Sequence, residues 1–426
     1  MANQMQAIGG TPGGPGTNQA AQPGPGSLFR VPKFSTRRRF VSDQANRTVG
    51  ITPLQGSQSV VGLTKLDQLD IVTGWKFYLT GLTSTWTTGT GTLTTSPWFP
   101  SNVVQQLTVK LQAAYNTFNL TGPLAAIAQA FRPMWGSRGA GLVNPNAFAK
   151  PSVVTHPTFG TPYNMPTLNI DVPASIRFDE YYDLDVKGNP LRKIYDAIVS
   201  PQFMAAQARN VTPTLTLSPG ITSSDLLGGP VSANPLGTAS FAVGTPGSLL
   251  VKRDAFWTAN NPAANPPQFP WMYTRDYFTQ PTSGQNEVSV LIQNTGVSVG
   301  QVMALFGFIW DPQANSGNGA VVSLLNAIDH IELVTGGSLQ NISTEPAGLI
   351  DRMNSLYPNL VTDFPDGVFV WDFAMSEDGS YLTNESCINT YLVNGVALNI
   401  YFKNGQVPSA TSTVYLGVEA LKMATS

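Results

Sequence analysis

Two segments of the chain, about 223 positions apart, share one pattern of residues. Residues 104–127 read VQQLTVKLQAAYNTFNLTGPLAAI, and residues 328–350 read IDHIELVTGGSLQNISTEPAGLI. Each segment starts with apolar residues at alternate positions, which is typical of a strand, and passes through a loop to a proline that begins a short helix. Identity between the segments is low, so the repeated feature is the order of elements. The repeat predicts two similar domains in tandem.

Apolar residues recur with period two along most of the chain, in runs interrupted by Gly, Pro, Asn and Ser. Such runs predict short strands joined by turns, which is the profile of an all-β protein. The expected strands cover residues 66–82 (with a bulge at Gly74), 104–111, 176–186, 214–217, 249–257, 288–292, 302–310, 331–333, 368–373, 388–392, 397–402 and 413–421. Short helices are expected at 124–131 and 346–356, and long loops at 133–173 and 218–248. In this scheme the aromatic strand at 176–186 corresponds to the strand at 368–373.

Residues 258–270 read TANNPAANPPQFP and form the best internal boundary, because four prolines in thirteen residues favour a linker. We therefore expect a flexible basic N-terminal arm at 1–55, a first β domain at 56–262 and a second at 263–426.

Charged residues make up only 11% of the chain, against roughly 25% in an average soluble domain. A solvated monomer usually carries more charge, so much of the surface is expected to be covered by other molecules. The sequence contains no run of about 18 uncharged apolar residues, so no membrane span is predicted. Residues 1–29 have no feature of a signal peptide. A large assembly is therefore favoured over a membrane-spanning protein. Cys387 is the only cysteine, which favours folding in a reducing cytoplasm.

A basic cluster follows the Gly- and Pro-rich residues 1–29. Its members are Arg30, Lys33, Arg37, Arg38 and Arg39, interleaved with Phe29, Phe34 and Phe40. Such a cluster in a charge-poor chain favours an arm that touches an anionic surface, either nucleic-acid phosphate or lipid headgroups. The alternative is a solvated run of charge at a domain edge.

The densest acidic cluster is Asp179, Glu180, Asp183 and Asp185. A solvated face is the simplest interpretation of it, a divalent cation held between subunits is the second, and a pair of catalytic carboxylates is the third. His156 and His330 have no ligand spacing that suggests zinc. No catalytic residue, metal ligand or cofactor site is predicted, and we expect no enzyme activity.

Five tryptophans lie in or beside expected strands: Trp75, Trp257, Trp271, Trp310 and Trp371. Core packing explains such positions most simply. An aromatic platform for sugars is the alternative, and it would fit a β-sandwich receptor-binding or carbohydrate-binding spike of a virion.

The C-terminal segment NGVALNIYFKNGQ, followed by STVYLGVEALKM at Ser412 to Met423, carries a resemblance to a known family. The chain resembles the double jelly-roll major capsid proteins of tailless, internal-membrane-containing bacteriophages, the tectivirus-like group. The layout of residues 56–426 and the early basic arm fit this group, whereas the loops 133–173 and 218–248 have no counterpart that can be assigned.

The resemblance implies an all-β chain of two tandem eight-stranded β jelly rolls with short helices and long loops. It implies a structural homotrimer of near-hexagonal outline that is made in the host cytoplasm and tiles an icosahedral virion shell over an internal lipid membrane. Expected partners are neighbouring trimers, minor capsid and vertex proteins and the membrane, with no direct nucleic-acid contact. The arm, with Arg30, Lys33, Phe34, Arg37, Arg38, Arg39 and Phe40, is expected to face the inner side of the shell and contact the membrane.

Overall fold

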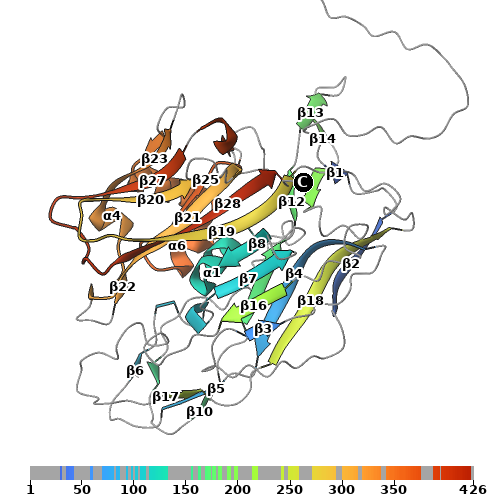
Figure 1. The fold of residues 1–426 in the computed structure, drawn as a ribbon, viewed down its shortest axis with the longest axis horizontal. Helices are drawn as coiled ribbons and strands as arrows, with labels where there is room; N and C mark the ends of the chain where they lie inside the picture. The colour runs from blue at the N-terminus through green and yellow to red at the C-terminus, as the bar shows by residue number, and fades with distance from the viewer. Residues whose placement is uncertain are drawn as a thin grey trace, which may run out of the picture.

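The computed structural model is mostly β, with a few short helices (Figure 1). It describes residues 29–30, 35–42, 58–60, 70–80, 83–86, 93–94, 97–98, 101–103, 106–111, 115–132, 155–156, 162–164, 168–173, 175–178, 181–184, 190–192, 196–199, 214–218, 241–243, 248–258, 271–293, 300–314, 319–336, 342–375, 387–393 and 395–423.

Eight main strands build the C-terminal half of the molecule. They are β19 (Trp271–Pro281), β20 (Glu287–Gln293), β21 (Gln301–Asp311), β23 (Ile328–Gly336), β24 (Ile342–Thr344), β25 (Phe369–Asp372), β27 (Gly395–Phe402) and β28 (Thr413–Met423). One sheet has the order β19-β28-β21-β25 and the other β20-β27-β23-β24, with all neighbours antiparallel. Numbered along the chain, these orders are 1-8-3-6 and 2-7-4-5, which is the topology of a β jelly roll.

Eight strands in the N-terminal half repeat this topology. They are β2 (Ser35–Ser42), β3 (Gln58–Val60), β4 (Asp70–Thr80), β7 (Gln106–Leu111), β8 (Tyr115–Leu120), β11 (Leu168–Pro173), β16 (Thr214–Ser218) and β18 (Ser248–Thr258). Their sheets have the orders β2-β18-β4-β11 and β3-β16-β7-β8, again 1-8-3-6 and 2-7-4-5. The predicted fold class, two tandem jelly rolls with short helices, is therefore confirmed. The strands β2 to β18 are called the first roll below, and β19 to β28 the second roll.

The predicted helices also occupy equivalent places, α1 (Gly122–Phe131) after β8 and α5 (Pro346–Leu356) after β24. In α1 the Thr121 hydroxyl accepts a hydrogen bond from the Leu124 backbone N–H, and each helix has a proline in its first turn. The other helices in the described residues are η1 (Ser101–Val103), α4 (Leu324–Ala327), α6 (Pro358–Asp363) and η5 (Thr390–Leu392).

The two rolls stand in the same direction, side by side. β19 of the second roll pairs in parallel with β8 of the first, at Arg275 and Phe118. β19 is the first strand of its roll and β8 the fifth strand of its own, and in this topology the first and fifth strands run in the same direction. Because β19 and β8 pair in parallel, equivalent ends of the two rolls lie at the same end of the molecule. Through this contact the sheet β3-β16-β7-β8 continues into β19-β28-β21.

One end of the molecule, the terminal end, holds the start and the finish of each roll. Ser35 lies opposite Thr258, and Trp271 lies opposite Met423. The small sheets β1-β15-β12 and β13-β14 belong to this end (Figure 1). Their strands are β1 (Phe29–Arg30), β12 (Ser175–Phe178), β13 (Tyr181–Leu184), β14 (Pro190–Arg192) and β15 (Asp196–Val199).

The opposite end, the loop end, holds the connections β4–β7, β8–β11 and β16–β18 of the first roll. Strands from all three connections pair there, in the sheets β10-β5-β17 and β6-β9. They are β5 (Thr83–Trp86), β6 (Leu93–Thr94), β9 (Thr155–His156), β10 (Pro162–Asn164) and β17 (Phe241–Val243). In the second roll the short strands β22 (Ala320–Val321) and β26 (Ile388–Asn389) pair with β21.

The strand predictions fail in several places. No strand was expected at β2, β8 or β19, and residues 390–392 of the expected strand 388–392 form the helix η5. The expected loop 133–173 contains β9, β10 and β11, and the expected loop 218–248 contains β17. The expected strand 176–186 divides into β12 and β13, and the counterpart of β25 is β11 instead. β11 forms because Leu168, Ile170 and Val172 alternate and pair with β4, a contact distant in sequence that the local Gly and Pro content hides.

The expected domain limits remain predictions. β18 ends at Thr258 and β19 begins at Trp271, so the linker of residues 259–270 lies outside the described residues. Strand β2 lies within the range 1–55 assigned to the arm and pairs with β18 in the first roll.

The core of the second roll is covered on both sides. β21 is buried along Val302 to Ile309, whereas β27 alternates between buried and partly exposed positions. A strand covered on both faces reads as a continuous apolar run, as QVMALFGFIWD does. The second cover comes from the first roll, because Phe131 of α1 packs on Phe306 with ring centroids 5.2 Å apart and Trp98 packs on Phe308 at 4.3 Å.

The packing of Phe306 predicts the effect of a small change at Gly417. A Cβ atom there would lie 2.3 Å from the Phe306 ring, which is itself held against α1. We expect Gly417→Ala to lower the free energy of unfolding by about 1–3 kcal/mol, as overpacking does. Ser289→Ala, at an exposed position of β20, should change the free energy of unfolding by no more than about 0.5 kcal/mol. Urea denaturation of the two variants checks this, and equal midpoints would contradict it.

Candidate functional site

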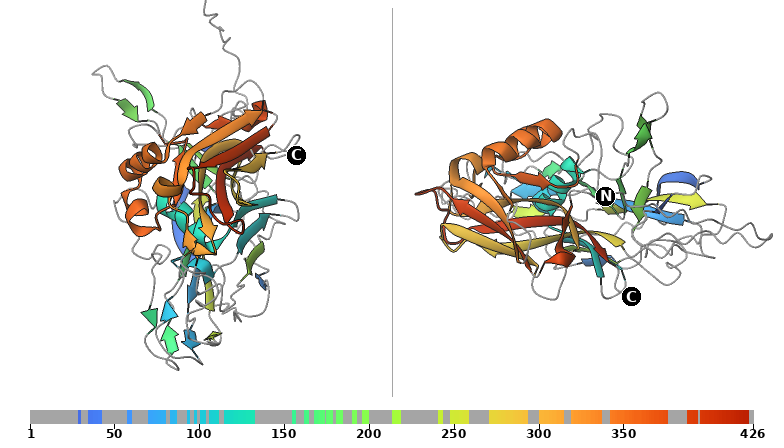
Figure 2. Two further views of the ribbon diagram at one scale, coloured as in Figure 1. Left: turned by 90° about the vertical axis from the view of Figure 1, so that its left-hand side faces the viewer. Right: turned by 90° about the horizontal axis from the view of Figure 1, so that it is seen from above.

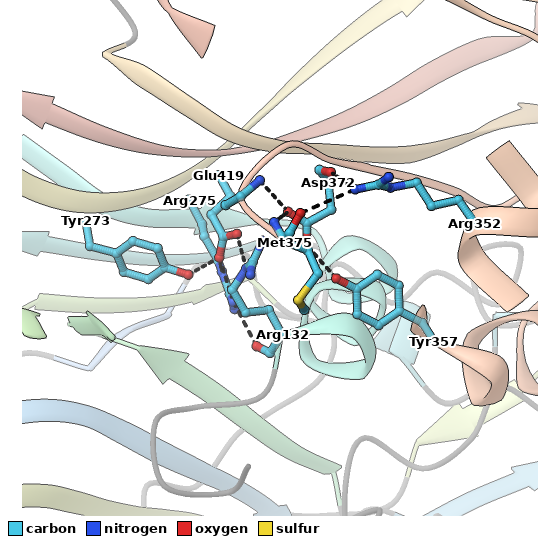
Figure 3. Close-up of polar contacts among 9 residues, drawn as sticks. Arg132, Tyr273, Arg275, Arg352, Tyr357, Asp372, Met375 and Glu419 are labelled. Atoms are coloured by element: carbon cyan, nitrogen blue, oxygen red, sulfur yellow. Dashed lines mark hydrogen bonds and ion pairs between the residues drawn. The ribbon is translucent and has the colours of Figure 1, made fainter. Parts of the chain in front are cut away.

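The most concentrated group of charges in the described residues is a buried cluster between the two rolls (Figure 3). Arg132 follows α1 in the first roll, while Arg275 on β19, Asp372 on β25 and Glu419 on β28 belong to the second. All four side chains are at most 4% exposed. Their formal charges cancel, which allows such a group to be buried.

Glu419 is the centre of the cluster. Its Oε1 atom accepts hydrogen bonds from Arg275 Nη2 at 3.0 Å and Arg275 Nε at 3.2 Å, and from the Tyr273 hydroxyl. Its Oε2 atom accepts a hydrogen bond from Arg132 Nε. Arg275 Nη2 also donates to the Arg132 carbonyl oxygen at 3.0 Å, so both arginines join the carboxylate and each other.

Asp372 holds the other side of Arg132. Arg132 Nη2 lies 2.8 Å from Asp372 Oδ2, which also accepts a hydrogen bond from the Tyr357 hydroxyl. Asp372 Oδ1 accepts from the backbone N–H groups of Ala374 at 2.9 Å and Met375 at 3.2 Å. The carboxylate is thus fixed by contacts on both oxygens.

Two members of the cluster have raised pKa values. Burial by itself lowers the pKa of Arg132, but Asp372 and Glu419 outweigh this, and the pKa lies well above its ordinary value. Burial raises the pKa of Tyr273 well above its ordinary value, so the phenol stays neutral and donates a hydrogen bond to Glu419. An enclosed, charge-balanced group of this kind joins structural parts of the molecule.

A surface pocket of about 510 Å³ lies at the loop end of the second roll. It is lined by Leu325, Asp329, His330, Ser343, Glu345, Pro346, Ala347 and Lys403. His330 Nδ1 lies 2.8 Å from Asp329 Oδ2, and the imidazole stacks on Tyr401 at 4.2 Å. The charged residues that line the pocket have mixed sign. Among the described residues, no group of three His, Cys, Asp or Glu is able to hold a metal ion.

Cys387 is a poor nucleophile. Burial raises the pKa of its thiol to about 12, so the thiol is protonated at neutral pH. Among the expected tryptophans, Trp371 is buried in the core and Trp310 packs partly buried against it, which confirms core packing for these two.

The predicted membrane-contact residues lie in two places. Arg30 is in β1 opposite Asp196, and Arg37, Arg38, Arg39 and Phe40 are in β2, at the terminal end of the first roll. Lys33 and Phe34 lie outside the described residues, as do Asp179, Glu180 and Asp185 of the acidic cluster; Asp183 is in β13. The contact of these residues with a membrane remains a prediction.

The sequence analysis missed the buried cluster. The available signal was single charges inside apolar runs, such as Glu419 in VYLGVEALKM and Arg132 after LAAIAQAF. A charge in such a run is rarely buried without a partner. The partners lie far apart in sequence, so local patterns do not reveal which charges meet.

Among the described residues, no helix is long and apolar enough to cross a bilayer.

The comparisons with known proteins identify the fold. No family model and no curated protein matches the chain. The crystal structure of the STIV MCP covers 91% of this chain and 95% of its own, with a TM-score of 0.51 and 13% identity. The atomic structure of Sulfolobus Turreted Icosahedral Virus covers 93% and 91% at a TM-score of 0.48 and 13% identity. The structure of PBCV-1 VP54 fitted into a reconstruction of the virophage Sputnik covers 93% and 95% at 0.48 and 10% identity.

The buried cluster predicts a difference between two ion pairs. Arg132→Met leaves Asp372 and part of Glu419 buried without their charge partner, and we expect it to lower the free energy of unfolding by about 3–5 kcal/mol. Lys422→Met breaks a partly exposed pair, 3.9 Å from Asp276, and should cost about 1 kcal/mol or less. Guanidinium denaturation followed by circular dichroism measures both. A loss for Arg132→Met no greater than that for Lys422→Met would show that the cluster does not hold the rolls together.

Proposed function

We propose that this chain is the major capsid protein of an icosahedral virus. The observation that carries the proposal is the pair of jelly rolls of identical topology that stand in the same direction within one chain. A shell is built by repeating similar upright units side by side, and this chain already repeats the unit once. The likeness in fold to the STIV MCP over most of both chains supports the same function.

Three copies supply six similar rolls, which suits a trimer of near-hexagonal outline in a closed ring. The low content of charged residues favours extensive covered surface in such an assembly. Neighbouring trimers, minor capsid proteins and vertex proteins are the further partners we propose. The protein then works in the virion shell as a structural subunit, without enzyme activity or cofactor.

We place the terminal end of the rolls on the inner side of the shell, above an internal membrane. The basic cluster supports this orientation, because Arg30 and strand β2 lie at the terminal end. Each Lys or Arg near an anionic leaflet contributes on the order of 1 kcal/mol, and several copies in one trimer act together. The C-terminal resemblance adds membership of the tectivirus-like bacteriophage group to the proposal.

The first test is the state of association. The purified full-length protein should have the mass of a trimer in light scattering at micromolar concentration, and particles should show a lattice of near-hexagonal units in electron microscopy. An obligate interface of this kind buries roughly 2,000–5,000 Å², which keeps it associated on dilution. A stable monomer would overturn the proposal, and a monomer that binds glycans would favour the spike.

The second test is flotation with vesicles that contain anionic lipid, in low salt. Wild-type protein should float with the vesicles, and Arg30→Ser with Lys33→Ser should weaken binding about tenfold or more, at about 1 kcal/mol for each charge. A matched variant, Lys403→Gln with Asn404→Asp, changes net charge equally at the loop end and should bind like wild type. If both double variants bind equally, the membrane contact is wrong.

A further inference from the structure

Within one chain, the helix after β8 covers the second roll. Figure 2 shows α1 enclosed between the two rolls, and most of its residues are buried. Phe131 packs on Phe306 and Tyr357, and the next residue, Arg132, binds Glu419 and Asp372. One part of the inter-roll contact is therefore a face of α1 that lies on the sheet β19-β28-β21 and beside α6.

The equivalent helix of the second roll has the equivalent face exposed. α5 contacts β25 and α4 of its own roll, as α1 contacts β11 and η1. Phe131 and Arg132 contact the second roll, and Leu124, Ala125 and Ala128 are buried and lie on the same face of α1 at helical spacing; the alignment of Pro123 with Pro346 gives the equivalents of this face. These equivalents in α5 are Ala347, Gly348, Asp351, Asn354 and Ser355, and all five are exposed. An exposed glycine inside a helix costs about 1 kcal/mol relative to alanine, which favours a close approach by a partner.

The first roll has a matching sheet, and a shared bulge fixes the comparison. β4 has one extra residue, Thr73, opposite Asp254 and Ala255 of β18. β21 has one extra residue, Met303, opposite Glu419 and Ala420 of β28. Asp254 therefore holds the register position of Glu419.

The same register assigns four basic residues to this sheet. Arg37, Lys76 and Lys252 hold the positions of Tyr273, Phe306 and Gly417. Arg39 is one of two residues, with Phe40, that lie opposite Asp254 at a bulge of β2, at the place that Arg275 has in β19. The register thus gives this sheet of the first roll an acid at the place of Glu419 and more basic residues than the second roll has.

The charges of the two surfaces are complementary. The exposed face of α5 carries Asp351, Glu345 is exposed at its start, and Asp363 is partly exposed at the end of α6. No basic residue of α5 is fully exposed, since Arg352 is partly buried and donates to the carbonyl oxygens of Asp372 and Met375. An acidic helix face and a basic sheet suit each other, and they steer two copies together.

We propose that α5 of one copy docks on the sheet β2-β18-β4 of the first roll of the next copy, in the way that α1 docks on β19-β28-β21 within one chain. The inference rests on the proposed trimer and names its contact surfaces. Three such head-to-tail contacts close a ring in which each roll has two like neighbours. Arg37 and Arg39 belong to this contact, which leaves Arg30 and Lys33 for the inner side of the shell.

The test is a cysteine cross-link between copies. Phe131 contacts Phe306 within the chain, so its counterpart Asn354 should meet Lys76 of the next copy. We expect Asn354→Cys with Lys76→Cys to form covalent dimers and trimers under mild oxidation, as seen on non-reducing gels. Each single variant, and Glu287→Cys with Lys76→Cys, should stay monomeric on the gel. Cys387 is the same in every variant and its thiol is partly buried, with a pKa that burial raises to about 12, so the single variants control for it.

A second variant tests the same contact in case the double cysteine variant does not fold. Asp351→Lys should weaken the trimer about tenfold or more in sedimentation, the change that corresponds to about 1.4 kcal/mol. Glu287→Lys, an equal charge change on the exposed strand β20, should leave the trimer unchanged. This contact alone is overturned if the wild type is a trimer, the double cysteine variant does not cross-link, and Asp351→Lys does not weaken the trimer. A monomeric wild type would overturn the proposed function, and the contact with it.

Discussion

The joint between the rolls depends on one carboxylate, Glu419, and the two arginines that share it. Burying an ion costs several kcal/mol even after the protein relaxes, so each of these charges is tolerable only while its partners are present. Arg132 comes from the first roll and the others from the second. The second roll therefore cannot bury Glu419 and Asp372 in this way without the first. A buried ionic group of this kind favours one relative position of the two rolls over others, more than it adds stability.

Burial between the two rolls also explains the composition of the segments near the cluster. α1 contains no charged residue, because it lies between two sheets and has no solvent face to support one. β21 is a continuous apolar run for the same reason. Gly417 keeps its place because the Phe306 ring occupies the space above it. Fixed charges at one end and close-packed rings along the sheet together hold the rolls in register.

Much of the fold could be predicted from the sequence, and the site could not. Strands such as β4, β21 and β28 combine strong periodicity with clear ends, so their predicted limits agree closely with the structure. β11 was missed because a short strand in a Gly- and Pro-rich region is stabilised by its distant partner β4, not by local preference. The cluster was missed for a related reason. Arg132, Arg275, Asp372 and Glu419 are brought together by the pairing of β19 with β8 and β28 and of β21 with β25 and β28, which no local pattern encodes.

The helices α1 and α5 hold equivalent places in the two rolls and differ in chemistry, and the proposed contact between copies accounts for the difference. α1 meets its sheet during folding of a single chain, so an apolar face there is covered as soon as the chain is native. A face that meets another copy must stay soluble until assembly, and large exposed apolar patches promote unspecific association. Small and polar residues at Ala347, Gly348, Asp351, Asn354 and Ser355 satisfy that requirement. Complementary charge then supplies the selectivity that apolar packing supplies inside the chain. A repeated unit can in this way use one docking geometry twice, with an apolar version within the chain and a more polar version in the proposed contact between chains.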